Sequence, residues 1–168
     1  MKKILVAMVI AITGLVASAS ASDMVHYVGV NGGTSTIGNV DATVYGLTFG
    51  GEKVLSEPGS GNGLLVGMDV YIDAYNFDTK NVSVSTETTI YGYGVNGKLG
   101  YTWNGISAFG LLSGGGLDTG YTYSYGAGIE YKLFSHMTLG ANYETGTYAL
   151  TGGDFDIDSA RGYLRFDW

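Results

Sequence analysis

The sequence alternates between apolar and polar positions with a period of two, and this pattern constrains the fold more than any other feature. Between residues 121 and 133 every second residue is apolar, whereas the residues between them are Gly, Ser, Thr and single charges. Residues 91–103, 64–75 and 137–144 show a similar alternation. Successive side chains of a β-strand point to opposite faces, so the pattern predicts strands with one apolar face. Beyond the first 21 residues no helical period is present.

Eight such segments can be placed along the chain, although three of them, at about 25–33, 43–54 and 106–113, alternate less clearly, and the one at 106–113 is apolar on both faces. They cover about residues 25–33, 43–54, 64–75, 91–103, 106–113, 121–133, 137–144 and 157–168. Short turns are predicted at 56–62, 104–105 and 134–136, and more polar connections at 34–42, 78–88, 114–120 and 151–156. The two kinds of link alternate, which predicts turns at one end of a meander and polar loops at the other. The predicted fold is therefore all-β, an eight-stranded antiparallel up-and-down transmembrane β-barrel, because about 9–11 tilted residues cross hydrocarbon.

A secreted lipocalin-like barrel is the alternative, and it differs in the direction of the alternation. A soluble barrel turns its apolar face inward. Here the apolar faces are wide, continuous and rich in Tyr, Leu, Val and Ile, and the opposite faces carry small polar residues and charges of both signs. This favours a membrane barrel. Aromatic residues near the two ends of the strands predict interfacial girdles formed by Tyr91, Tyr93, Tyr101, Trp103, Tyr121, Tyr123 and Tyr131.

The composition excludes several other classes of protein. The chain of 168 residues has 29 Gly, one Pro, no Cys and a formal net charge of −7. Without Cys there is neither a disulfide framework nor a Cys-based zinc site. The acidic balance argues against a nucleic-acid partner, and the apolar content is too high for a disordered chain.

The first residues have the pattern of a secretory signal. Lys2 and Lys3 precede an apolar stretch at residues 4–16, and small residues at 17–21 offer cleavage sites. The apolar stretch is shorter than the roughly 20 residues of a membrane-spanning helix. We predict a cleaved signal peptide at residues 1–21, with cleavage after Ala19 as the alternative, and a barrel domain at residues 22–168.

The last strand has the pattern of a second targeting signal. Ala160, Gly162, Leu164, Phe166 and Trp168 share one face, and the opposite face has Arg161, Tyr163, Arg165 and Asp167. This ending resembles the carboxy-terminal strand of bacterial outer-membrane barrels, which ends in Phe or Trp and is read by the membrane assembly machinery.

With the signal peptide and the eight segments, the chain from residue 22 onward resembles the small outer-membrane β-barrel family of the OmpA/OmpX type. Trp168 stands where Phe is commoner. The resemblance implies an integral outer-membrane monomer with periplasmic termini, in contact with lipids and lipopolysaccharide. It also implies an assembly signal at Tyr163, Leu164, Phe166 and Trp168. No peptidoglycan-binding domain is expected after Trp168.

Charged residues on the inward faces are expected to form a network in the lumen. They are Asp69, Asp73, Lys98, Glu130, Lys132, Glu144, Arg161, Arg165 and Asp167. An eight-stranded barrel is just wide enough for side chains to fill it, and buried charges must pair or lose several kcal/mol each to desolvation. A lumen plugged by salt bridges is therefore predicted, with an ion path lined by the same residues as the alternative.

Three motifs suggest chemistry that their context does not support. Residues 92–97 match G-x-G-x-x-G, but the chain continues as a strand and not as the helix of a dinucleotide site. Asp154, Asp156 and Asp158 lack the Gly and the distant Glu of a calcium loop, so a solvated acidic loop is predicted. His26 and His136 are the only histidines, and both are expected near the periplasmic rim.

Neither catalytic residues nor a metal or cofactor site is therefore expected. Three function classes stay open on the sequence alone. The favoured one is a structural or surface-interaction barrel, the second is a narrow passive channel, and the third is a lipid-modifying enzyme.

Overall fold

In a computed structural model of the chain, residues 24–56, 61–77, 88–117, 120–150 and 152–168 are described. They form eight strands: β1 (Val25–Ile37), β2 (Val40–Ser56), β3 (Gly63–Phe77), β4 (Thr88–Trp103), β5 (Ile106–Leu117), β6 (Gly120–Phe134), β7 (Met137–Leu150) and β8 (Gly153–Asp167). The predicted signal peptide lies outside the described residues. Within these ranges, no helix has the length and apolar character needed to span a membrane.

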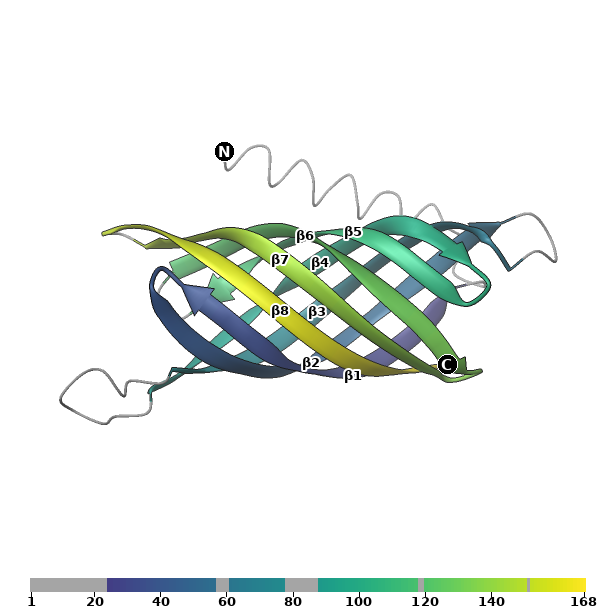
Figure 1. Ribbon diagram of the computed structural model, residues 1–168, viewed down its shortest axis with the longest axis horizontal. Coiled ribbons are helices and arrows are strands. Elements are labelled where there is room, and N and C mark those ends of the chain that lie inside the picture. The colour runs from purple at the N-terminus through teal and green to yellow at the C-terminus, as the bar shows by residue number, and fades with distance from the viewer. Residues whose placement is uncertain (1–23, 57–60, 78–87, 118–119, 151) are drawn as a thin grey trace.

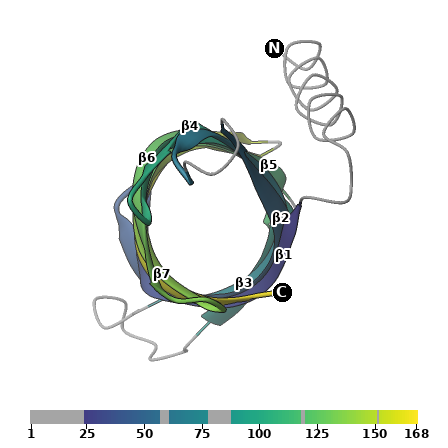
Figure 2. The same cartoon turned by 90° about the vertical axis from the view of Figure 1, so that its right-hand side faces the viewer.

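The strands close into a barrel in chain order. Each strand pairs antiparallel with the next, and β1 pairs with β8 from Tyr27↔Asp167 to Ile37↔Ile157. Figure 1 shows the strands tilted around the barrel, and Figure 2 shows them as one ring seen along the axis. The prediction of an eight-stranded antiparallel up-and-down barrel is confirmed. We call the end that carries Val25 and Asp167 the terminus end, and the opposite end the distal end.

The strands are longer at the distal end than predicted. β1 and β2 continue through the expected 34–42 loop and meet at a tight turn, where Gly38 has a φ of 61°. β5 runs to Leu117 and β8 begins at Gly153, so most of the loops expected at 114–120 and 151–156 is strand. The prediction of these loops was wrong because Gly, Thr, Ser and Asp at strand ends resemble loop composition while the strands continue to pair. The loop expected at 78–88 lies outside the described residues, apart from Thr88.

The direction of the alternation is the one expected of a membrane barrel. Large apolar side chains point outward, as on β2, where Tyr45, Leu47 and Phe49 are 46–51% exposed. The intervening residues point into the barrel, where Asp69, Asp73 and Glu130 are buried. β5, whose faces were ambiguous, turns Phe109 and Leu111 inward.

The interior also contains two apolar clusters. One lies towards the distal end and joins β1, β2, β3, β5, β7 and β8 through Ile37, Ala42, Val44, Tyr75, Leu117, Tyr148 and Ile157. The other consists of Leu65, Phe109 and Leu111 nearer the terminus end. The register of β3 and β8 places the buried charges nearer the terminus end than the distal cluster.

Candidate functional site: a charged network in the barrel lumen

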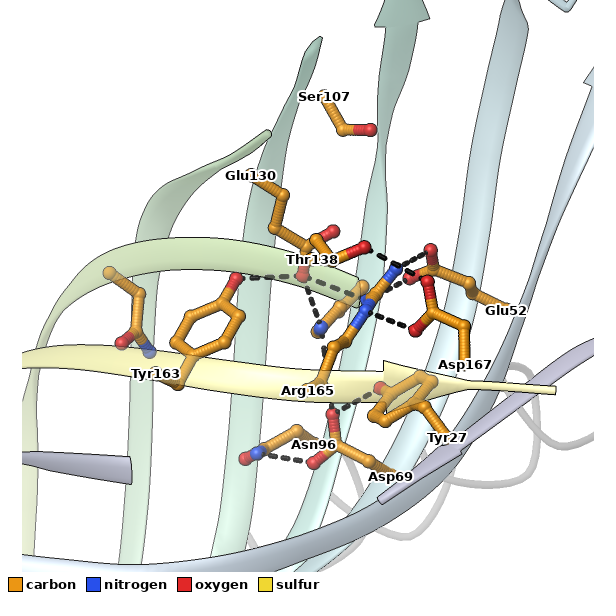
Figure 3. A network of polar contacts seen from close by, with 12 residues as sticks. Tyr27, Glu52, Asp69, Asn96, Ser107, Glu130, Thr138, Tyr163, Arg165 and Asp167 are labelled. Atoms are coloured by element: carbon orange, nitrogen blue, oxygen red, sulfur yellow. Dashed lines mark hydrogen bonds and ion pairs between the residues drawn. The ribbon is translucent and has the colours of Figure 1, made fainter. Parts of the chain in front are cut away.

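Arg165 is the centre of the network near the terminus end. It projects inward from β8 and pairs with Glu52 of β2 through both guanidinium Nη atoms, one of them 2.6 Å from Glu52 Oε2. Its Nη1 also lies 3.0 Å from Glu130 Oε1, and its Nε lies 3.0 Å from Asp167 Oδ1 (Figure 3). One cation therefore joins carboxylates from three strands, β2, β6 and β8.

Lys98 of β4 extends the network across the barrel. Its Nζ lies 2.8 Å from Glu130 Oε1 and 3.8 Å from Asp69 Oδ2. Three aromatic rings surround the ammonium, with centroids 5.1–5.5 Å away, and they belong to Tyr27, Phe109 and Tyr163. A cation over ring faces gains electrostatic attraction that compensates part of its lost hydration.

Two of these rings also bind the carboxylates. The Tyr27 hydroxyl donates to Asp69 Oδ2 at 2.9 Å, and the Tyr163 hydroxyl donates to Glu130 Oε1 at 2.7 Å. The Tyr163 ring fits over Gly140 of β7, where an added Cβ would lie 2.3 Å from Tyr163 Cζ. The small residue thus makes room for the ring that orients Glu130.

A second group lies nearer the distal end. Arg161 Nη1 is 2.5 Å from Asp73 Oδ2, and Arg161 Nη2 donates to the Tyr75 hydroxyl at 3.0 Å. Asn31 donates to the other oxygen of Asp73 at 3.1 Å. This group joins β1, β3 and β8.

Glu144 of β7 is held differently from the other buried acids. Its Oε2 accepts hydrogen bonds from Ser113 at 2.7 Å and Ser124 at 2.8 Å, and its Oε1 accepts one from Asn142 at 2.8 Å. Neutral donors thus bind this carboxyl group, and none of the ion pairs found among the described residues includes it.

The acids in the lumen outnumber the bases. Glu52, Asp69, Asp73, Glu130, Glu144 and Asp167 are buried. The cations among them are Lys98, Arg161 and Arg165. Removing ions from water costs several kcal/mol each, so the hydroxyl and amide donors of the interior are needed to satisfy the remaining carboxyl oxygens.

Two small cavities remain between these side chains. Their volumes are about 50 and 20 Å³, and Tyr71, Asn96, Glu144 and Arg161 border both. A site for one water needs roughly 10–15 Å³, so each cavity has room for water. The arrangement can hold charges and water in fixed places.

Comparisons with known proteins find similarity at the level of structure. No family model and no curated protein sequence matches the chain. Neisserial surface protein A superposes with a TM-score of 0.56 at 11% identity, covering 86% of this chain and 97% of that one. Ail, the attachment invasion locus protein of Yersinia pestis, gives 0.54 at 13% identity, with coverages of 86% and 98%. The chain has the fold of the small outer-membrane β-barrels.

In this outer-membrane barrel fold, eight of the nine residues predicted for the lumen network have buried or half-buried inward side chains. Lys132 differs, because it is exposed at the end of β6, next to a register shift between Lys132 and Phe134. Glu52 was missed. Its parity on β2 is opposite to that of the outward Tyr45, Leu47 and Phe49, so the alternation could have placed it in the lumen. The neutral partners, such as Tyr27 and Ser113, carry no charge and gave no comparable signal.

The other predicted residues lie on the surface of the barrel, with one exception. Tyr91, Tyr93 and Tyr121 are 50–67% exposed on the distal parts of their strands, and Tyr123 is half-buried. Tyr101, Trp103 and Tyr131 are 51–60% exposed nearer the terminus end. In the terminal segment, Leu164 is half-buried, and Phe166 and Trp168 are exposed. Tyr163 is the exception, since it faces the lumen.

The candidates for other chemistry lie apart from the lumen. His26 and His136 are exposed at the terminus end, where His136 Nδ1 is 3.1 Å from the Asp167 carbonyl oxygen. Asp154, Asp156 and Asp158 lie on β8 with outward parity, and not on a loop. No cluster of three or more His, Cys, Asp or Glu suited to a metal ion is found in the described ranges.

Proposed function

We propose that this chain is an integral outer-membrane barrel whose lumen is closed by side chains and whose role is structural or in surface interaction. The observation that carries the proposal is the network of Arg165, which joins Glu52, Glu130 and Asp167 across the lumen. The distal apolar cluster and the small cavities support it. Wide aqueous channels belong to barrels of about 16 strands.

The proposed orientation puts both termini in the periplasm. The longest interval between consecutive strands separates Phe77 from Thr88, and these two residues pair at the distal end. Outer-membrane barrels carry their longer loops on the outside, which supports an external distal end. The proposed partners are the membrane lipids with lipopolysaccharide, and the assembly machinery that reads Tyr163, Leu164, Phe166 and Trp168. We expect a monomer without enzymatic activity.

The kind of surface partner is constrained by charge. Ail was crystallised in complex with the heparin analogue sucrose octasulfate. Here the described residues at the distal end include Asp41, Asp154, Asp156 and Asp158, and no Lys or Arg of the described ranges is there. We therefore infer that a polyanion of this kind is not the partner of these residues.

Conductance in planar lipid bilayers tests the closed lumen. The purified barrel is expected to give no stable, reproducible conductance steps. The variant Arg165→Met removes the cation at the centre of the network that closes the lumen. It is expected to conduct ions only if this change loosens the network. Lys132→Met, at an exposed position, serves as its control. Regular steps from the unaltered chain, shifted by charge reversal at Lys98, would instead establish the alternative of a narrow passive channel.

A further inference from the structure

The apolar belt of the outer surface is much taller on one half of the barrel than on the other. On β3–β6 the outward positions are apolar over runs of 11 to 13 residues: Leu64–Ala74, Tyr91–Trp103, Ile106–Gly116 and Tyr121–Leu133. On β7, β8, β1 and β2 the corresponding runs are of 5 to 9 residues: Met137–Tyr143, Ala160–Trp168, Val28–Gly32 and Tyr45–Gly51. We call the second half the short-belt face.

Polar side chains form a continuous row just beyond the distal end of the short belt, and on β1 and β2 the outward Thr34 and Thr43 lie between the apolar runs and this row. The register pairs Thr145 of β7 with Asp158 of β8, Asp158 with Thr36 of β1, and Thr36 with Asp41 of β2. Thr36 donates to Asp41 Oδ1 at 2.7 Å. The Tyr143 hydroxyl, from the last apolar position of β7, donates to Asp158 Oδ1 at 2.9 Å. Such groups belong at a membrane interface and not in hydrocarbon.

The difference in height is large compared with a membrane. A strand rises about 3.3 Å per residue, and a tilt of about 40° leaves roughly 2.5 Å along the barrel axis. The tall belt is then about 28–33 Å high and the short one about 13–23 Å, against a usual apolar band of about 25 Å. The apolar surface of the short-belt face is therefore too short for the hydrocarbon thickness that the tall face matches.

Tilting the whole barrel does not remove the difference. On β4, β6, β7 and β8 the apolar runs reach close to the terminus end of the barrel, at Trp103, Leu133, Met137 and Trp168, whereas on β1 and β2 the outward His26 and Lys53 lie between the runs and that end. A tilt that matched the distal end would therefore create a mismatch of the opposite sense at the terminus end. The mismatch has to be absorbed by the lipid beside the short-belt face, in the leaflet at the distal end.

We propose that the barrel thins the bilayer locally along β7, β8, β1 and β2. The partner of this face is the lipid itself, whose headgroups descend to the row of Thr145, Asp158, Thr36 and Asp41. The inference rests on the proposed membrane insertion. It predicts a site of disordered lipid packing beside the β1–β8 seam, confined to one side of the protein.

Depth measurements on single-cysteine variants test the proposal, and the absence of Cys from the chain makes the labelling specific. Ala160→Cys on β8 and Val95→Cys on β4 are matched, because each lies eight residues from Trp168 or Trp103 at the terminus end. Each is spin-labelled in vesicles of phosphatidylcholine with 16-carbon chains. The ratio of oxygen to nickel-chelate collisions is expected to be lower at position 160 than at position 95, because a thinned bilayer brings the headgroups nearer to that label.

Each outcome of this experiment bears on a different claim. Equal depths at the two positions would overturn the thinning. Spin–spin broadening at position 160 would show that a second copy covers the face, which also overturns it. A chain that stays outside the vesicles, with no heat-modifiable gel shift, would contradict the proposed membrane function instead.

A dependence on lipid chain length gives a second readout. The variant Thr34→Val, Thr145→Val and Asp158→Val extends the short belt on β1, β7 and β8. Asn76→Val with Thr89→Val extends only the tall one. The unaltered chain is expected to fold several-fold faster in vesicles with 12-carbon than with 18-carbon chains. The triple variant should lessen this preference and the double variant should keep it. The same preference in all three would count against the short belt as its cause.

Discussion

At the scale of single residues, Arg165 shows why the interior charges depend on one another. Its guanidinium contacts Glu52, Glu130 and Asp167, and each of these groups is buried. Removing one partner from a buried ion pair leaves an uncompensated charge in a medium that solvates it poorly. The stability of the barrel should therefore depend more on each member of this network than on any exposed charge.

Replacing Arg165 with Met keeps much of the volume and removes the cation. We expect the free energy of unfolding to fall by about 3–5 kcal/mol, since three carboxylates lose a partner. Urea titration in lipid vesicles, followed by Trp fluorescence, measures the change. Lys132→Met, at an exposed position, should stay within about 0.5 kcal/mol. A loss at Arg165 no larger than at Lys132 would refute the role given to the network.

At the scale of the strand, the depth of an outward residue in the membrane decides how much a charged substitution lowers the free energy of unfolding. On β7, Leu139 lies within the apolar run and Thr147 lies beyond its distal end, and both have outward parity. The strand's period of two thus sets the face, and the position along the strand sets the surrounding medium.

The same substitution at these two positions should have unequal costs. Leu139→Arg is expected to lower the free energy of unfolding in vesicles by more than Thr147→Arg, because a charge on the lipid face costs about 2–4 kcal/mol at the bilayer midplane and about 0–1 kcal/mol near the interfaces. Reversible urea unfolding measures both. Equal losses would mean that the apolar run of β7 does not face lipid.

The last strand, β8, also shows how much of the fold could be predicted from the sequence. Parity on β8 placed Arg161, Arg165 and Asp167 inward and Phe166 and Trp168 outward, as in the structure. The alternation did not indicate where β8 begins, because acidic residues such as Asp154 and Asp156 are typical of loops. The pairing Tyr148↔Phe155 extends the strand by contacts with a neighbour that the local sequence does not show.

At the scale of the whole molecule, closure depends on the seam between β1 and β8. Gly33 and Gly32 are adjacent on β1, but only Gly33 faces Arg161 across the seam. A Cβ on Gly33 would lie 2.0 Å from the Ala160 carbonyl oxygen, whereas one on Gly32 would have its nearest neighbour at 3.8 Å. Backbone, rather than a movable side chain, blocks the first position.

This asymmetry yields a test of barrel closure. Gly33→Val is expected to abolish or greatly reduce the fraction that migrates as the heat-modifiable folded form on unboiled gels. Gly32→Val should fold like the unaltered chain. Normal folding of Gly33→Val would contradict the pairing of β1 with β8 at this register.

The sequence by itself determined which face of each regular strand is apolar, because that depends only on a local period of two. It also predicted the number of strands and the closed antiparallel order from the spacing of the turns. Only the tertiary structure decided which charges meet. Glu52 reaches Arg165 from 113 residues away, whereas Lys132, with the same parity as Glu130, is exposed at the end of β6. Such pairings follow from register and from position along the axis, and both are set by contacts between strands distant in the chain.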